Sequence, residues 1–365
     1  MHLSFASVTL TGLSCLSVLA SAIPTNFSFA NNPTGEGFPK PNAQQLVAIE
    51  AQAHGSLPNG PSPSSVKNNT VTSLQLIAFN EIFETAFFTS LIQNITNNVT
   101  GYAVSNSTLR YASLEALVAI RAQEELHTLF ANNSLTALGA KPVQTCEFMF
   151  PVATLPDAIA LASKFTDIVL GTLPAIQLLL AMSNDSALIP GIGSVIGQEG
   201  EQNGAYRLFQ NKIPSALPFL TAGTREFAFS ALNQNFIVPG SCAVDYIDLP
   251  VFKPLTVVTN AIAARNQTLS FEFPMSNGST TFNASSYSLA YVNQQNIPVI
   301  EPLQNITANQ TSKTMKFNAA FPYNGTTFGN GLTYALVVNG STTGLTSAAD
   351  VAAITVYGPG LIEIN

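Results

Sequence analysis

Apolar residues recur at alternating spacings of three and four positions through the first two thirds of the chain. This period is typical of helices that bury one face in a bundle. The pattern predicts four long helices, one beginning near residue 72 and the others over 108–131, 154–182 and 194–212, followed by a shorter helix at 219–233.

Ionisable and amide side chains occupy several positions of these buried stripes. They are Glu81 and Glu84 on the first helix, Glu124 and His127 on the second, and Glu199 and Gln202 on the fourth. Burial of a charge is costly without a cation or hydrogen bonds nearby. We therefore expect five of these side chains to converge inside the bundle, with Glu81 about one turn away. The five are Glu84, Glu124, His127, Glu199 and Gln202. Arg121 and Glu125 fall off the stripe, and we interpret them as solvated.

Beyond residue 249 the texture changes to short runs rich in β-branched and aromatic residues, separated by turns. Alternating apolar positions predict antiparallel strands. The expected strands cover 255–258, 268–273, 287–292, 314–321, 332–338 and 354–357. The predicted fold class is α+β and multidomain, a four-helix bundle at 71–250 followed by a small antiparallel β-sandwich at 251–365.

The first 70 residues have a different character. Residues 1–22 hold an apolar run that ends in Ala20-Ser21-Ala22, which is typical of a secretory signal peptide. Residues 23–70 are rich in Pro, Gly, Ser and Asn and predict an extended arm, with one short helix at 42–53. We expect the product to be secreted, either extracellular or attached to the cell wall.

Composition excludes some partners. Charged residues make up 9% of the chain, the formal net charge is −7 and the pI is about 4.9, so no basic surface is available for nucleic acid. The apolar stretch at 168–182 is too short to span a membrane and contains Pro174, which favours a buried helix and no transmembrane anchor. The sequence contains no Gly-x-Ser-x-Gly motif, which would have indicated a hydrolase.

Two further features fit secretion. Removal of the leader leaves two cysteines, Cys146 and Cys242, for which a disulfide is the simplest interpretation and two separate buried thiols the alternative. Asn-x-Ser/Thr acceptors predict glycosylation. They are Asn26, Asn68, Asn94, Asn98, Asn106, Asn132, Asn184, Asn266, Asn277, Asn283, Asn305, Asn309, Asn324 and Asn339.

Three segments, 80–88, 124–127 and 198–202, together carry a family resemblance. They resemble the ferritin-like domain of secreted fungal stress-response and sexual-development proteins, which is similar to plant desiccation-related proteins. The β-rich region also resembles the tail domain of the fungal members. The resemblance implies a di-iron site built from one glutamate on each of two helices and a Glu-x-x-His pair on each of the other two.

The chain departs from that pattern at two places. Gln202 stands where the second histidine belongs, and the third helix has no glutamate, only Thr166-Asp167 near the expected position. We therefore expect a degenerate site. Its candidate metal ligands are Glu84, Glu124, His127 and Glu199, with Gln202 and Glu81 as neighbours.

Two hypotheses follow. In the first, the protein is a secreted stress or developmental protein without a cofactor or catalytic activity. Its bundle then holds a hydrogen-bonded polar cluster, and its β domain meets a surface or wall partner, either glycan or protein. In the second, the bundle is an atypical mononuclear oxidoreductase site with one iron or another divalent ion. The sequence does not indicate an oligomeric state.

Overall fold

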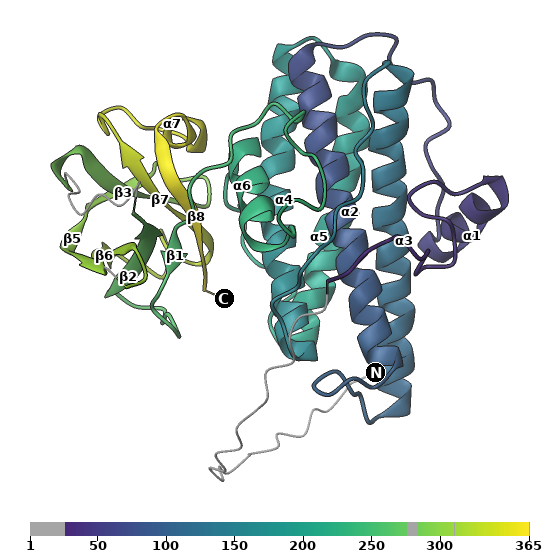
Figure 1. Cartoon of the computed structure of the whole chain (residues 1–365), viewed down its shortest axis with the longest axis horizontal. Coiled ribbons are helices and arrows are strands. Elements are labelled where there is room, and N and C mark those ends of the chain that lie inside the picture. Colours follow the sequence, from purple (N-terminus) through teal and green to yellow (C-terminus); the bar gives the residue numbers. More distant parts are fainter. Residues whose placement is uncertain (1–25, 276–283, 310, 365) are drawn as a thin grey trace.

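The computed structural model describes residues 26–275, 284–309 and 311–364. Four long helices stand side by side as a bundle (Figure 1): α2 (Asn68–Thr96), α3 (Ser107–Ala137), α4 (Leu155–Met182) and α5 (Ile189–Phe209). They pack chiefly as two pairs, α2 with α3 and α4 with α5. A short 3-10 helix, η1 (Ser186–Leu188), precedes α5. The arrangement confirms the predicted bundle.

Capping contacts explain where two of these helices begin. The Thr154 hydroxyl accepts from the Asp157 backbone N–H and starts α4, as the sequence predicts. Helix α2 begins four residues before the expected start at Thr72. The Asp185 carboxylate accepts from the Lys67 backbone N–H at 3.0 Å and from the Thr70 hydroxyl. A residue between α4 and α5 therefore caps α2, which local sequence cannot reveal.

Helix α1 (Ala43–Ala53) lies against the outer side of α3 (Figure 1). Its N-cap is Asn42, so the short helix that the sequence predicts at 42–53 is present. Ile49 is fully buried in this contact. Arg121 and Glu125 are also buried here, which overturns the expectation that they are solvated, because the arm covers a second face of α3.

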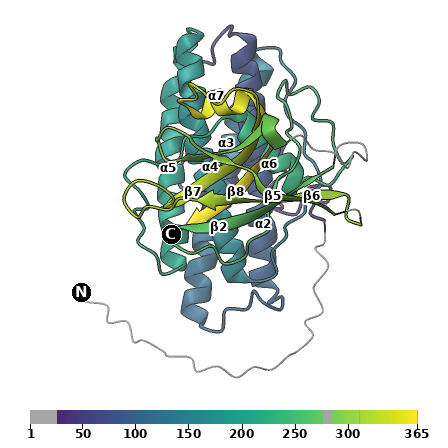
Figure 2. The same ribbon diagram turned by 90° about the vertical axis from the view of Figure 1, so that its left-hand side faces the viewer.

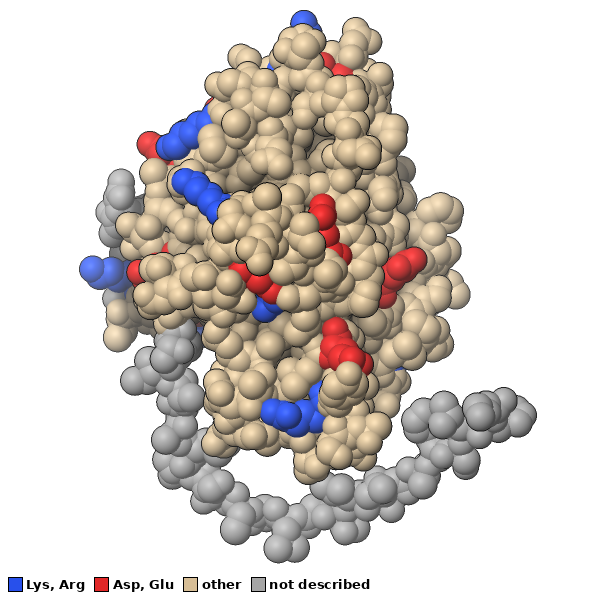
Figure 3. All heavy atoms as spheres, turned by 90° about the vertical axis from the view of Figure 1, so that its right-hand side faces the viewer, with Lys and Arg blue, Asp and Glu red and all other residues tan. Residues whose placement is uncertain are grey.

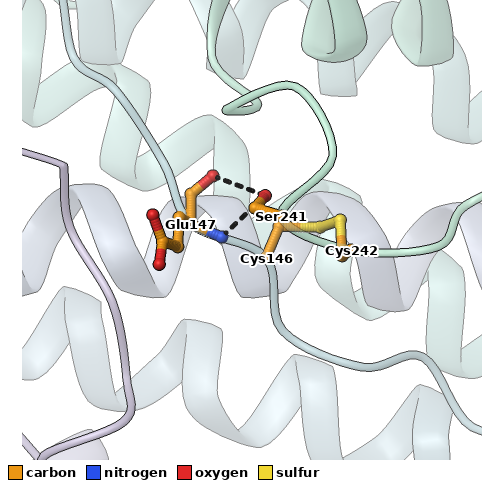
Figure 4. Close-up of a disulfide and its surroundings, with 4 residues drawn as sticks. All are labelled: Cys146, Glu147, Ser241 and Cys242. Atoms are coloured by element: carbon orange, nitrogen blue, oxygen red, sulfur yellow. Dashed lines mark hydrogen bonds between the residues drawn. A yellow bond between two sulfur atoms is a disulfide. The ribbon is translucent and has the colours of Figure 1, made fainter.

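Two long connections of the bundle are joined by a disulfide between Cys146 and Cys242, whose Cα atoms are 4.9 Å apart (Figure 4). The Ser241 hydroxyl accepts from the Glu147 backbone N–H at 3.1 Å beside it. Isolated β-bridges tie Phe148 to the arm and to the segment that follows α6 (Arg225–Asn235). The two cysteines that we paired from the sequence therefore lie at disulfide distance.

The C-terminal part contains two four-stranded antiparallel sheets, in the orders β1-β2-β6-β5 and β4-β3-β7-β8. Aromatic rings meet between them, Phe271 with Tyr291 and Phe273 with Tyr357, so the sheets form two facing layers. The elements are β1 (Thr256–Val257), β2 (Gln267–Pro274), η2 (Ala284–Ser286), β3 (Tyr287–Asn293), β4 (Val299–Pro302), β5 (Gln304–Asn309), β6 (Thr314–Phe321), β7 (Gly331–Asn339), α7 (Ala348–Ala353) and β8 (Thr355–Ile364).

The β4-β3-β7-β8 sheet lies against the helices, so the β part sits directly beside the bundle (Figures 1 and 2). Strand β7 is buried on both faces from 331 to 338. On the helical side, the Tyr334 ring lies 5.1 Å from that of Phe227 on α6. The bundle and this sheet therefore share one apolar core.

Helix α4 is the one described helix that is long and apolar enough to cross a membrane. It runs for 28 residues, close to the predicted helix at 154–182, and extends well beyond the apolar stretch at 168–182. In its most apolar window, 61% of the residues are buried inside the fold. This burial is what a core helix of a bundle shows.

Most of the described glycosylation acceptors are exposed. These are Asn26, Asn68, Asn98, Asn106, Asn184, Asn266, Asn305, Asn309, Asn324 and Asn339. Asn94 and Asn132 are partly buried, and the Asn132 amide exchanges two hydrogen bonds with the Val143 backbone. Asn277, Asn283 and the expected signal peptide at 1–22 lie outside the described residues.

Candidate metal centre

Three helices supply the polar side chains inside the bundle. Glu81 and Glu84 come from α2, Glu124 and His127 from α3, and Glu199 and Gln202 from α5. Each of the four glutamates is at most 1% exposed, whereas the His127 side chain is 14% exposed. The structure thus places all six residues in the bundle interior.

Four of these residues form a compact group. Ligand atoms of Glu81, Glu124, His127 and Glu199 all lie within 4.8 Å of one another. The His127 Nδ1 atom is 2.9 Å from a Glu124 oxygen, 3.4 Å from a Glu81 oxygen and 3.9 Å from a Glu199 oxygen. One imidazole nitrogen therefore faces three carboxylates around a small common space.

The structure differs from the sequence-based assignment of Glu81 and Glu84, because the expected neighbour lies in the compact group and the expected ligand lies outside it. Glu81 belongs to the compact group, while a Glu84 oxygen accepts from Asn80 Nδ2 at 2.9 Å. The stripe could not separate the two, because every residue of α2 from 72 to 89 is buried. Only the positions of the neighbouring helices decide which glutamate reaches His127.

Gln202 acts on the site through Glu124. Its Nε2 donates to a Glu124 oxygen at 2.5 Å and to Gln123 Oε1 at 3.3 Å. Its Oε1 accepts from the Tyr206 hydroxyl at 3.0 Å. Gln202 therefore orients the Glu124 carboxylate through its amide nitrogen, while its amide oxygen is engaged by Tyr206.

Thr166 and Asp167 do not complete the group. Asp167 accepts from Asn203 Nδ2 at 2.8 Å, and the Asn203 Oδ1 accepts from the Ser163 hydroxyl at 2.7 Å. Burial raises the pKa of Asp167 to about 6, although the hydrogen bond from Asn203 opposes that shift. Asp167 therefore belongs to a second polar cluster between α4 and α5.

Burial and mutual repulsion govern the charges in the compact group. Burial raises the pKa of Glu81 to about 8, with His127 opposing the shift. Burial raises the pKa of Glu199 well above its ordinary value, and the charge of Glu124 adds to it. Burial lowers the pKa of His127, but the charge and hydrogen bond of Glu124 outweigh this effect and raise it to about 10.

Unpaired oxygens show what the group lacks. Among the described residues, both carboxylate oxygens of Glu199 and one of Glu81 are buried without a hydrogen-bond partner, as is one oxygen of the neighbouring Glu84. Buried polar atoms are nearly always paired, so such atoms call for an explanation, and an unseen cation is one. Three carboxylates and one imidazole suit Fe²⁺, Mn²⁺ or Zn²⁺. The residues therefore fit a single divalent ion.

The same residues do not fit two ions. A symmetric pair would need a second imidazole and a carboxylate from α4. Gln202 and Asp167 are engaged in other hydrogen bonds, and neither belongs to the compact group.

Three residues that support the site, Gln123, Tyr206 and Asn80, are not among the site residues predicted from the sequence. Tyr206 lies four positions after Gln202 on α5, and Asn80 four positions before Glu84 on α2. This spacing places the partners on one helix face and could have identified them. Gln123 reaches α5 from the position next to Glu124, and the stripe gives no signal for that contact.

Comparison with known families supports the fold of the bundle. Residues 70–212 match the family described as "Ferritin-like domain". The match begins within α2 and ends just after α5, and it contains all six site residues. This part of the chain is a ferritin-like domain, and the β part lies outside the match. No curated protein matches the chain.

Proposed function

We propose that the ferritin-like domain binds one divalent metal ion through Glu81, Glu124, His127 and Glu199. The observation that supports this most is the common space of the four ligand atoms, which all lie within 4.8 Å of one another. The unpaired Glu199 oxygens strengthen the argument, because a cation would satisfy both.

The protein residues have distinct tasks in this proposal. His127 offers Nδ1 to the ion, and its proton is then carried on Nε2. Gln202 holds Glu124 in place through its 2.5 Å hydrogen bond, and Tyr206 fixes the orientation of the Gln202 amide. A bound ion would supply a Lewis acid or a one-electron redox centre. We do not expect the two-iron oxidation chemistry of ferritins.

We further propose that the protein is a glycosylated, secreted protein of the stress or developmental type, acting at the cell surface or wall. The leader sequence, the exposed acceptor asparagines and the Cys146–Cys242 disulfide support secretion. The resemblance to fungal stress-response and sexual-development proteins supports the biological role. The β part would then meet a glycan or protein partner.

A second candidate function is a metal-free polar cluster with a purely structural role. Several hydrogen bonds inside the group favour it, including those from Gln202 to Glu124 and from Asn80 to Glu84. The unpaired oxygens of Glu199 count against it.

Elemental analysis of the natively secreted protein, purified without chelators, tests the proposal. We expect about one divalent ion per chain.

Metal-free protein should also bind one Co²⁺, which is detected by its visible absorption. Glu124→Gln should abolish this signal, whereas Glu125→Gln should keep it. Glu125 is the matched control, because it is equally buried on the same helix but faces Arg121 and Glu36. A protein that holds no ion and binds no Co²⁺ would favour the metal-free cluster.

A further inference from the structure

A pocket of about 420 Å³ lies at the end of the bundle where α3 and α4 begin and α5 ends. Its lining is largely apolar and includes one residue from each of these helices, Leu109, Leu155 and Phe209. Leu109 is 53% exposed and Phe209 is 41% exposed, so apolar surface faces solvent here. None of the lining residues carries an ionisable side chain. The pocket therefore favours a neutral occupant with an apolar face.

Ser113 on α3 contributes a hydroxyl group to this lining. The residue is 7% exposed, and its hydroxyl makes no hydrogen bond with any described residue. The hydroxyl is nevertheless not among the fully buried side-chain atoms that lack a partner. It is therefore reached from the pocket, where an occupant can form the missing hydrogen bond.

The glycosylation acceptor Asn106 belongs to the same lining and is exposed. As the N-cap of α3, it accepts from the Leu109 backbone N–H through Oδ1 at 3.0 Å. Its Nδ2, the atom to which an N-linked glycan is attached, makes no hydrogen bond with a described residue. In Asn132, by contrast, Nδ2 donates to the Val143 carbonyl. A glycan on Asn106 is therefore compatible with the helix cap.

The distribution of charge also favours a neutral, hydrated occupant. Charged side chains are sparse on the side of the molecule that α1 and α3 form (Figure 3). A glycan over the pocket would cover the apolar side chains of Leu109 and Phe209 and present hydroxyl groups to water in their place.

We propose that the first N-acetylglucosamine of a glycan on Asn106 occupies this pocket. Its apolar ring face packs against Phe209 and Leu109, and one of its polar groups hydrogen-bonds to the Ser113 hydroxyl. The volume equals that of about fourteen water molecules, which suits one sugar residue with its acetamido group. Covalent attachment keeps the sugar beside the pocket, so its docking loses little translational freedom. The inference rests on the proposed glycosylation and gives one glycan a place in the fold.

Enzymatic release of glycans from the folded, natively secreted protein tests the proposal. Peptide N-glycosidase converts each released acceptor to aspartate, so mass spectrometry of peptides gives a release rate for each site. We expect the glycan on Asn106 to be released at least about fivefold more slowly than that on Asn98, because the docked sugar must leave the pocket before cleavage. Asn98 is the matched control site, since it is exposed and lies outside the pocket lining. Denatured protein supplies the intrinsic rate of each site.

Two variants locate the protection. Phe209→Ala removes the ring beneath the sugar and should bring the release rate at Asn106 to within about twofold of that at Asn98. Tyr111→Ala is the matched control and should keep the difference, because Tyr111 is 65% exposed and lies outside the pocket lining.

Three results would overturn the proposal. They are equal release rates at Asn106 and Asn98 in the folded parent, a difference that survives Phe209→Ala, and an unmodified Asn106 in protein that is glycosylated at other acceptors. The proposed glycosylation itself stands in all three cases. Secreted protein without any glycan would overturn both proposals, so the two failures are distinguishable.

Discussion

At the scale of single residues, Glu199 would couple stability to the proposed metal binding. Its carboxylate is fully buried with both oxygens unpaired, and burial raises its pKa. For such a group, stability is greatest below the ordinary pKa and is lost as the pH rises through the raised value. At neutral pH the metal-free protein therefore bears a cost at this position, which a bound cation would remove.

The variant Glu199→Gln should separate these effects. In the metal-free state at pH 7.5, we expect it to be more stable than the parent by about 1–3 kcal/mol, because it removes a buried carboxyl group that must either take up a proton on folding or remain charged without a partner. It should also lose Co²⁺ binding. Urea unfolding of both chelated proteins measures the difference. A metal-free variant that is less stable than its parent would show that the carboxylate is satisfied without a cation.

Asp167 provides a pH dependence away from the metal ligands. Burial raises its pKa from 3.8 to about 6, so stability decreases as the pH rises between these values and is constant above them. Asp167→Asn keeps an acceptor for Asn203 and removes the charge. We expect it to stabilise the protein by roughly 2–3 kcal/mol at pH 7.5 and by little at pH 4. Urea midpoints at both pH values test this, and an equal gain at both would contradict it.

The sequence could identify the polar positions but not their partners. The helical stripe pointed to Glu124, His127 and Glu199 because each replaces an apolar residue at a buried position. It could not show that Gln202 would donate to Glu124, or that Tyr206 would hold its amide. Those contacts depend on the distance and rotation between α3 and α5, which one-dimensional periodicity does not contain.

At the scale of elements, α1 acts as a cover for α3. The sequence predicted this short helix from its cap and length, but not its packing partner. The spacing of apolar residues predicts one buried face for each helix. Helix α3 instead buries one face in the bundle and another under α1. The prediction that Arg121 and Glu125 are solvated was wrong for this reason.

The variant Ile49→Ala should loosen this cover. Ile49 is fully buried between α1 and α3, so its truncation should cost about 2–4 kcal/mol locally. Amides of α1 should exchange with deuterium much faster than in the parent, while those of α2 should change little. Val47→Ala is the control, because Val47 is 63% exposed on the same helix. Equal exchange in the two variants would mean that α1 does not depend on this contact.

The disulfide constrains two connections that lie 96 residues apart in the sequence. Loop-closure entropy predicts a contribution of about 4–5 kcal/mol, as an upper estimate. The double variant that carries both Cys146→Ser and Cys242→Ser should therefore have a free energy of unfolding that is lower by up to this amount. Alkylation of the unreduced, denatured parent should find no free thiol at either position. Two alkylated cysteines in the parent would contradict the pairing.

At the scale of the whole molecule, the fold class was predictable and the joint between its parts was not. The change from helical to alternating periodicity near residue 250 indicated α followed by antiparallel β. It could not show that β7 would be buried on both faces and pack Tyr334 against Phe227 on α6. Strand β7 carries apolar residues on both sides, which a two-layer sandwich alone does not require.

We propose that one ion, and not two, occupies the ferritin-like bundle. Anomalous X-ray diffraction from crystals of protein purified without chelators tests it most directly. We predict a single peak within coordination distance of Glu81, Glu124, His127 and Glu199. Two peaks about 3.5–4 Å apart would indicate a dinuclear centre, and no peak after soaking with Mn²⁺ or Co²⁺ would indicate a metal-free cluster. Either of those results would rule out a single bound ion.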